Sequence, residues 1–153
     1  MNILVTVGTK PFDLLIAAAD QQFSNTEFSV TCQIASGSYQ PEHHPYIHFT
    51  NSFSELIASA DIVITHGGAA TVFELLEAGK KIVLVPNSLR TDNHQKDMAS
   101  YVEHNQYGIV CRSLNGLVST VKKCSRTKFN AYAKDQFFMG GDILEYFDLP
   151  FQK

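Results

Sequence analysis

The stretch "ADIVITHGGAATVFELLEAGKKIVLVPN" (60–87) contains a complete strand–helix–strand pattern. Two short apolar runs, "DIVIT" (61–65) and "KIVLVP" (81–86), are typical of buried strands. Between them, "ATVFELLEAG" (70–79) has apolar residues at helical spacing and ends at a glycine. Because parallel strands need a long crossover connection, the stretch predicts two parallel strands joined by a helix.

The same alternation continues on both sides of this unit. Further strands are predicted over 2–7, 27–35, 46–50 and 109–111, and further helices over 11–23, 52–60 and 94–106. The remainder, 113–153, is predicted to be mostly helical. Strands that alternate with helical crossovers indicate an α/β fold, a doubly wound and mostly parallel sheet of the Rossmann-like kind. We expect one domain over residues 1–153.

Composition excludes several classes of function. The net charge is −3, with 12 basic and 15 acidic residues and no basic cluster, so nucleic acid is not expected as a partner. No apolar run approaches the roughly 20 residues that a membrane-spanning helix needs. The three cysteines are far apart in sequence, which predicts free thiols in a reducing cytoplasm. The histidines show no ligand spacing, so no metal is expected.

The turn after the predicted strand 61–65 consists of very small residues: Gly67, Gly68, Ala69 and Ala70. Small residues at a helix start leave backbone N–H groups accessible beside the positive end of the helix dipole, which favours a phosphate or diphosphate. Thr71 adds a hydroxyl donor. Alternatively, Thr71 and Glu74 have the spacing of a capping box, and the glycines only make the turn.

Two other turns follow strands at the same predicted edge of the sheet. Gly8 and Thr9 follow the first strand, without the spacing of a nucleoside-triphosphate loop or a dinucleotide fingerprint. After the strand at 81–86, "RTDNHQ" (90–95) places Asn93, His94 and Gln95 at a helix start. These side chains suit sugar hydroxyls. Alternatively, Asp92 or Asn93 caps the helix with Gln95 closing the capping box, and His94 is an ordinary loop histidine.

Three segments together resemble one known family: "VTVGTKPFDLLI" (5–16), residues 60–87 quoted above, and "DNHQKDMA" (92–99). Their order and spacing resemble the C-terminal, donor-binding half of the family 28 glycosyltransferases. The likeness is strongest to single-domain members, subunits that act in dolichol-linked oligosaccharide or bacterial polysaccharide synthesis. The resemblance implies one half of a two-domain fold called GT-B and a UDP-sugar as donor.

Roles for individual residues follow from the resemblance. Residues 67–71 would face the diphosphate with Thr9 nearby, and Glu74 would hold the ribose hydroxyls. Asn93, His94 and Gln95 would contact the sugar. His66 would donate to a phosphate or act as the catalytic base. The family often has Gly or Ser where this chain has Ala70, whose methyl group narrows the space for a phosphate.

The resemblance also implies the reaction and its partners. The expected reaction is an inverting sugar transfer to a lipid-linked saccharide, without a cofactor or bound metal. Because only one domain is present, we expect a membrane-anchored partner subunit that binds the acceptor. The chain would then be cytoplasmic and peripheral at the inner face of the membrane, docked partly through 137–151. The alternative is a subunit that binds or activates without catalysing.

Overall fold

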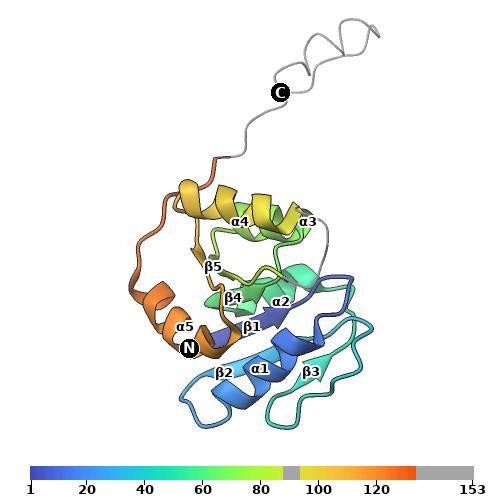
Figure 1. Cartoon of the computed structure of the whole chain (residues 1–153). Helices are drawn as coiled ribbons and strands as arrows, with labels where there is room; N and C mark the ends of the chain where they lie inside the picture. Colours follow the sequence, from blue (N-terminus) through green and yellow to red (C-terminus); the bar gives the residue numbers. More distant parts are fainter. Residues whose placement is uncertain (88–93, 134–153) are drawn as a thin grey trace, which may run out of the picture.

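The apolar runs of the sequence form six parallel strands, and helices cover both faces of the sheet (Figure 1). A computed structural model of the chain describes residues 1–87 and 94–133. The strands are β1 (Asn2–Thr6), β2 (Ser29–Gln33), β3 (Tyr46–Ile47), β4 (Ile62–Thr65), β5 (Lys81–Leu84) and β6 (Ile109–Val110). The helices are α1 (Asp13–Phe23), α2 (Phe53–Ser59), α3 (Ala69–Glu77), α4 (His94–His104) and α5 (Leu117–Arg126), with a short 3-10 turn at Leu114–Gly116.

The strand order is β3-β2-β1-β4-β5-β6, and every neighbouring pair is parallel. The direction of winding therefore reverses between β1 and β4. In open α/β sheets, ligands bind beyond the carboxyl ends of the strands at such a switch point. The predicted doubly wound α/β fold is confirmed, and it brings the turns after β1 and β4 to one place.

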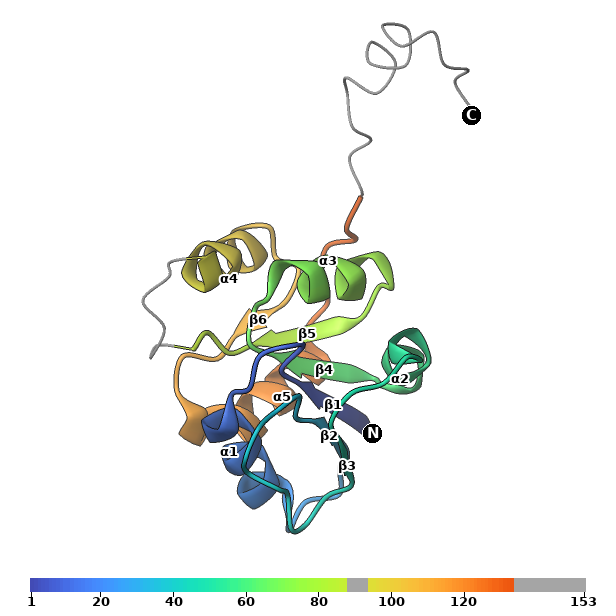
Figure 2. The same ribbon diagram turned by 90° about the vertical axis from the view of Figure 1, so that its right-hand side faces the viewer.

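Alternate residues of the central strands point to opposite faces of the sheet and pack into two separate hydrophobic cores. Ile3, Val5, Ile62 and Ile64 pack with α1 and α5, whereas Leu4 and Val63 point to the other face and pack with α2, α3 and α4. Figure 2 shows α1 and α5 on one side of the sheet and α3 and α4 on the other. Strands buried on both faces read as continuous apolar runs, which is why the sequence predicts them well.

Two predicted helix boundaries were wrong. Pro11 was expected in the first turn of α1, but the helix begins at Asp13, because Phe12 has non-helical backbone angles and buries its ring in the core. The helical prediction after 113 holds for α5 but not for residues 127–133, which have no regular secondary structure. The predicted docking segment 137–151 lies outside the described residues.

Candidate functional site

The turns after β1 and β4 touch each other across the switch point. A Cβ atom placed on Gly8 would lie 3.4 Å from Thr71 Oγ1 and 3.5 Å from His66 Cε1. One placed on Gly68 would lie 3.3 Å from His66 Nε2. A side chain at Gly68 would therefore crowd the His66 ring, and one at Gly8 would fill the space beside His66 and Thr71. The absence of a side chain at Gly8 and Gly68 leaves the space beside His66 and Thr71 open.

Gly8 and Gly67 are also required by the backbone. Their φ angles are 61° and 91°, in the left-handed region that residues with a Cβ atom rarely adopt. A Cβ atom on Gly67 would in addition approach Leu84 Cδ2 to 3.1 Å. The turn after β4 is thus shaped partly by conformation and partly by the core beneath it.

Almost all of the predicted site residues line one cavity of about 310 Å3. Its walls are Gly8, Thr9, Lys10, His66, Gly67, Gly68, Ala69, Ala70, Thr71, His94 and Gln95. Lys10 was not predicted, although it follows Thr9 directly. Glu74 does not line this cavity, and Asn93 lies outside the described residues. Residues after β1, residues after β4 and the first two residues of α4 therefore line one site in space.

The start of α3 forms the floor of this cavity. The helix begins at Ala69 with Gly68 as its N-cap, and no side chain makes a capping hydrogen bond there. The capping-box alternative for Thr71 and Glu74 is thus wrong, because Thr71 already lies inside the first turn. The first-turn N–H groups lie at the positive end of the helix dipole, which favours negatively charged groups.

A second cavity, of about 240 Å3, adjoins the first. The two share Gly8, Thr9, Ala70 and Thr71; the second adds Gln33, Phe49, Thr50, Phe53 and Glu74. Phe49 is 60% exposed, which is unusual for so large an apolar side chain. Together the cavities offer the start of α3, an aromatic wall formed by Phe49 and Phe53, and the carboxylate of Glu74 in one continuous site.

The aromatic wall was not among the predicted parts of the site. Phe49 lies within the predicted strand 46–50, and Phe53 lies within the predicted helix 52–60. Both positions therefore read as ordinary residues of a strand and a helix. What places them in the site is the position of β3 beside β2 at the edge of the sheet, which a single sequence does not reveal.

Gln95 holds the start of the connection between β5 and α4. Its side chain is buried, and Oε1 accepts a hydrogen bond of 2.8 Å from the backbone N–H of Asn87. His94, one residue earlier, is exposed and borders the first cavity. Gln95 therefore has a structural contact in addition to its place in the cavity wall.

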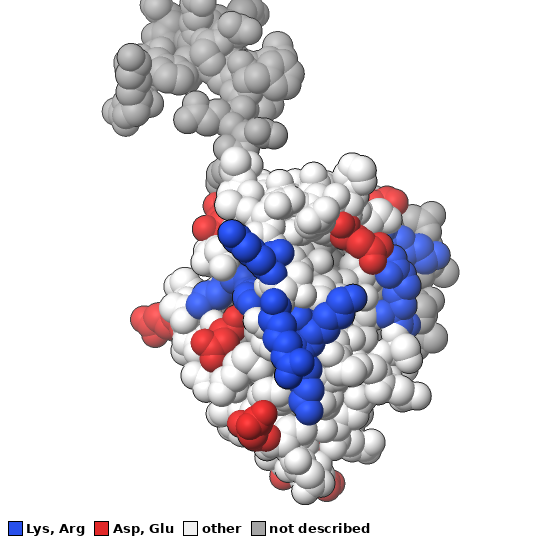
Figure 3. All heavy atoms as spheres, turned by 90° about the vertical axis from the view of Figure 1, so that its left-hand side faces the viewer, with Lys and Arg blue, Asp and Glu red and all other residues white. Residues whose placement is uncertain are grey.

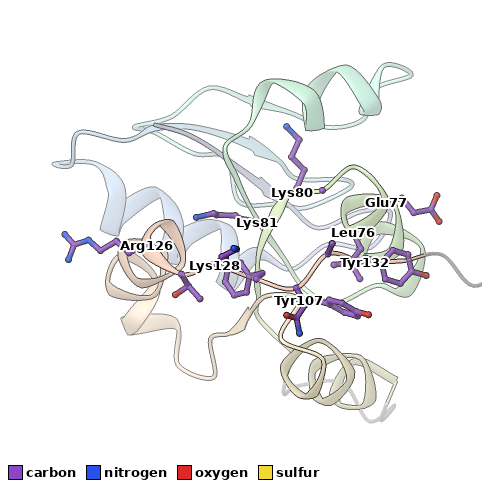
Figure 4. Close-up of a pocket in the computed structure, with 13 residues that line it drawn as sticks. Leu76, Glu77, Lys80, Lys81, Tyr107, Arg126, Lys128 and Tyr132 are labelled. Atoms are coloured by element: carbon purple, nitrogen blue, oxygen red, sulfur yellow. The ribbon is translucent and has the colours of Figure 1, made fainter.

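A larger cavity, of about 580 Å3, lies elsewhere in the described part of the chain, at the amino end of β5. Figure 3 shows a face on which Lys and Arg side chains gather, and Figure 4 shows this cavity with Lys80, Lys81, Arg126 and Lys128 around it. Two of these cations have structural partners. Lys80 Nζ donates to Ala58 O and Ala60 O, at 2.8 and 2.9 Å.

Lys81 binds the last carbonyl groups of α5, since its Nζ donates to Ser125 O at 2.6 Å and to Cys124 O at 3.3 Å. Lysines near helix C-termini satisfy the last carbonyl groups and offset the negative end of the dipole. The two lysines thus fasten α2 and α5 to the sheet, and the cavity contains none of the predicted site residues.

Within residues 1–87 and 94–133, no three His, Cys, Asp or Glu side chains gather as a metal site would require. No helix in that part of the chain combines the length and apolar character needed to cross a bilayer. Cys32, Cys111 and Cys124 are buried and free, as their spacing predicts.

Solved structures share this fold. The calicheamicin glycosyltransferase CalG4 aligns with a TM-score of 0.68 and 23% identity, over 82% of this chain and 34% of that one. MurG of Acinetobacter baumannii aligns with a TM-score of 0.65 and 22% identity, over 80% of this chain and 41% of that one. The fold is therefore that of one domain of a GT-B glycosyltransferase, as the sequence predicts.

The family follows from sequence comparison. The Glycosyltransferase family 28 C-terminal domain matches residues 2–138, and the chain belongs to this family. The human protein named UDP-N-acetylglucosamine transferase subunit ALG13 is 35% identical over an alignment of 127 residues, with coverage of 73% of this chain and 11% of that protein.

A bacterial relative has a different named activity. The UDP-N-acetylglucosamine–N-acetylmuramyl-(pentapeptide) pyrophosphoryl-undecaprenol N-acetylglucosamine transferase of Janthinobacterium is 34% identical over 113 residues, covering 65% of this chain and 31% of the relative. The chain thus spans about a tenth of the human relative and about a third of the bacterial one.

Proposed function

We propose that the chain is the catalytic, donor-binding subunit of a two-subunit inverting glycosyltransferase. It moves a hexose-type sugar from a UDP-sugar to a lipid-linked saccharide in polysaccharide or glycolipid synthesis. The observation that carries the proposal is the pair of joined cavities at the switch point. One has the character of an anion site, and the other has the aromatic and acidic groups that suit a nucleoside.

The diphosphate would bind in the first cavity. The backbone N–H groups at the start of α3 and the Thr71 hydroxyl would donate to its oxygens, with Thr9 and Lys10 at the rim. These fixed donors would stabilise the negative charge that develops on the leaving UDP, which is an electrostatic contribution to catalysis. No bound metal or cofactor is part of the proposal.

The uridine would bind in the second cavity. The base would pack on Phe49, since aromatic rings stack on bases of any kind. Glu74, exposed on α3 and free of a capping role, would accept hydrogen bonds from the ribose hydroxyls. The sugar would then extend from the diphosphate toward His94 and Gln95, with Asn93 as its neighbour in sequence.

His66 would donate to a phosphate or act as a base. It is only 8% exposed and lies between the Gly8 and Gly68 positions, on the diphosphate side of the site. That location supports the role of phosphate donor. The base that takes the acceptor's proton would then come from the partner subunit, which would be membrane-anchored and hold the chain at the inner face of the membrane.

Binding and turnover test the proposal in two steps. The chain alone should bind UDP in calorimetry. The chain co-expressed with its partner should then consume one sugar from a panel of UDP-sugars. Absence of UDP binding would contradict the donor site, whereas binding without turnover by the assembled pair would favour a non-catalytic binding or activating subunit.

A further inference from the structure

Gln33 joins two walls of the site through its side chain. It is the last residue of β2, is only 3% exposed and lines the second cavity. Its Nε2 donates to Gly8 O at 3.0 Å and to His48 O at 2.8 Å. One amide group therefore holds the turn after β1 and the segment after β3, which lie on opposite sides of β2.

The orientation of the Gln33 amide is fixed by its neighbours. Its Oε1 accepts a hydrogen bond of 2.6 Å from Thr6 Oγ1, and Thr6 Oγ1 in turn accepts one of 3.2 Å from the backbone N–H of Gly8. Because carbonyl oxygens only accept, the NH2 group must face Gly8 O and His48 O. The result is a closed set of hydrogen bonds with each donor matched to an acceptor.

The Gln33 side chain adds hydrogen bonds beyond the last backbone hydrogen bonds that β2 makes with its neighbours. At the carboxyl end of β2, those backbone bonds are Val7 N–H to Gln33 O, at 3.3 Å, and Ile34 N–H to Ile47 O, at 2.9 Å. The Gln33 amide adds one further hydrogen bond toward the β1 side and one toward the β3 side. His48 is held a second time, since its Nδ1 donates to Ala35 O at 2.9 Å.

We infer that Gln33 is a positioning residue of the donor site, which sets the spacing between the Gly8 turn and the wall formed by Phe49 and Thr50. The inference rests on the proposed function. A UDP molecule would touch both walls, with its diphosphate at the turn and its base at Phe49. A fixed spacing lets one rigid ligand satisfy both walls without a cost for ordering them at the moment of binding.

The test is UDP binding by Gln33→Met, which keeps the length of the side chain and removes its hydrogen bonds. We expect UDP affinity to fall by about tenfold or more, the loss typical of deleted buried hydrogen bonds. Uridine alone and inorganic diphosphate alone should lose less, because each touches a single wall. A role limited to stability would not produce this difference between the whole ligand and its parts.

Two sets of controls complete the experiment. Val121→Ala, in the α5 core, should lower stability and leave UDP affinity unchanged. Thr6→Val should weaken UDP binding and Thr6→Ser should restore it, and this pair decides the question if Gln33→Met does not fold. Two results would overturn the positioning role of Gln33 but leave the proposed function standing. One is wild-type affinity for UDP in folded Gln33→Met, and the other is equal affinity for UDP in Thr6→Val and Thr6→Ser. Failure of the wild-type chain to bind UDP overturns the proposed function as well.

Discussion

Thr6 and Thr65 are paired in register on the neighbouring strands β1 and β4, and both are fully buried, yet their hydroxyl groups differ in hydrogen bonding. Thr6 Oγ1 donates to Gln33 and accepts from the Gly8 N–H. Thr65 Oγ1 has no hydrogen-bond partner among the described residues. Because a buried polar group without a partner costs free energy, the two positions should respond oppositely to the same substitution.

Thr6→Val should lower the free energy of unfolding by about 1–3 kcal/mol, since it leaves Gln33 Oε1 and the Gly8 N–H without their partner. Thr65→Val removes an unsatisfied hydroxyl from a site of the same shape and should be neutral or stabilising. Urea unfolding of both variants beside the wild type measures the difference. Equal losses in the two variants would contradict this account of the hydrogen bonds.

Asp20 should make stability depend on pH in the acid range. Its carboxylate is fully buried and holds the loop between β2 and β3. Burial by itself raises the pKa of this group. The backbone N–H groups of Glu42 and His43, the His43 ring and the Tyr39 hydroxyl donate to it at 2.9–3.2 Å, and they lower the pKa from 3.8 to about 2.

A pKa that is lower in the folded state means that the ionised carboxylate stabilises the fold above pH 4. This contribution, about 2 kcal/mol, should be lost as the pH falls from about 4 to 2. Asp20→Asn should be less stable than the wild type at pH 7, and the gap should narrow through that window. Urea titrations at several pH values check it, with the exposed Asp97→Asn as the control. A gap that stays constant down to pH 2 would contradict the assignment.

Glu74→Gln should weaken UDP binding by about tenfold and leave the melting temperature unchanged, because the side chain is exposed and does not cap α3. The wild type should prefer UDP over 2′-deoxy-UDP, and the variant should lose much of that preference. Calorimetry with both ligands measures this. Glu55→Gln, an exposed residue on α2, is the matched control. If Glu74→Gln kept the full preference for UDP over 2′-deoxy-UDP, Glu74 would not be a partner of the ribose hydroxyls.

Gly68→Ala should affect mainly UDP binding, whereas Gly79→Ala should affect mainly stability. Gly68 has φ −63°, which alanine adopts without strain, but the methyl group would lie against His66 at 3.3 Å. Gly79 has φ 65° with no neighbour within 4 Å. We expect Gly68→Ala to weaken UDP binding with little loss of stability. Gly79→Ala should lose about 1 kcal/mol of stability with unchanged binding.

Calorimetry and thermal melts on both variants check this pair of outcomes. The opposite pattern, with binding lost at Gly79 and stability lost at Gly68, would show that the space beside His66 is not part of the site.

The sequence predicts the sheet and the glycine turn well because both depend on local signals. Ile62 to Ile64 form a short apolar run that is typical of a strand buried on both faces, and Gly67 needs a backbone angle that favours glycine. The spacing of Thr71 and Glu74 was misleading, since the helix starts before both residues. Phe49 and Gln33 were missed because their roles depend on which strands become neighbours.

The separate origin of the site's walls has a consequence for how such domains diversify. The Gly8 turn, the Phe49 segment, the start of α3 and the start of α4 belong to four different connections between strands. Each connection can change in length or composition while the strands that carry it stay in register. A new ligand preference can therefore arise by exchange of one loop, with the rest of the scaffold inherited intact.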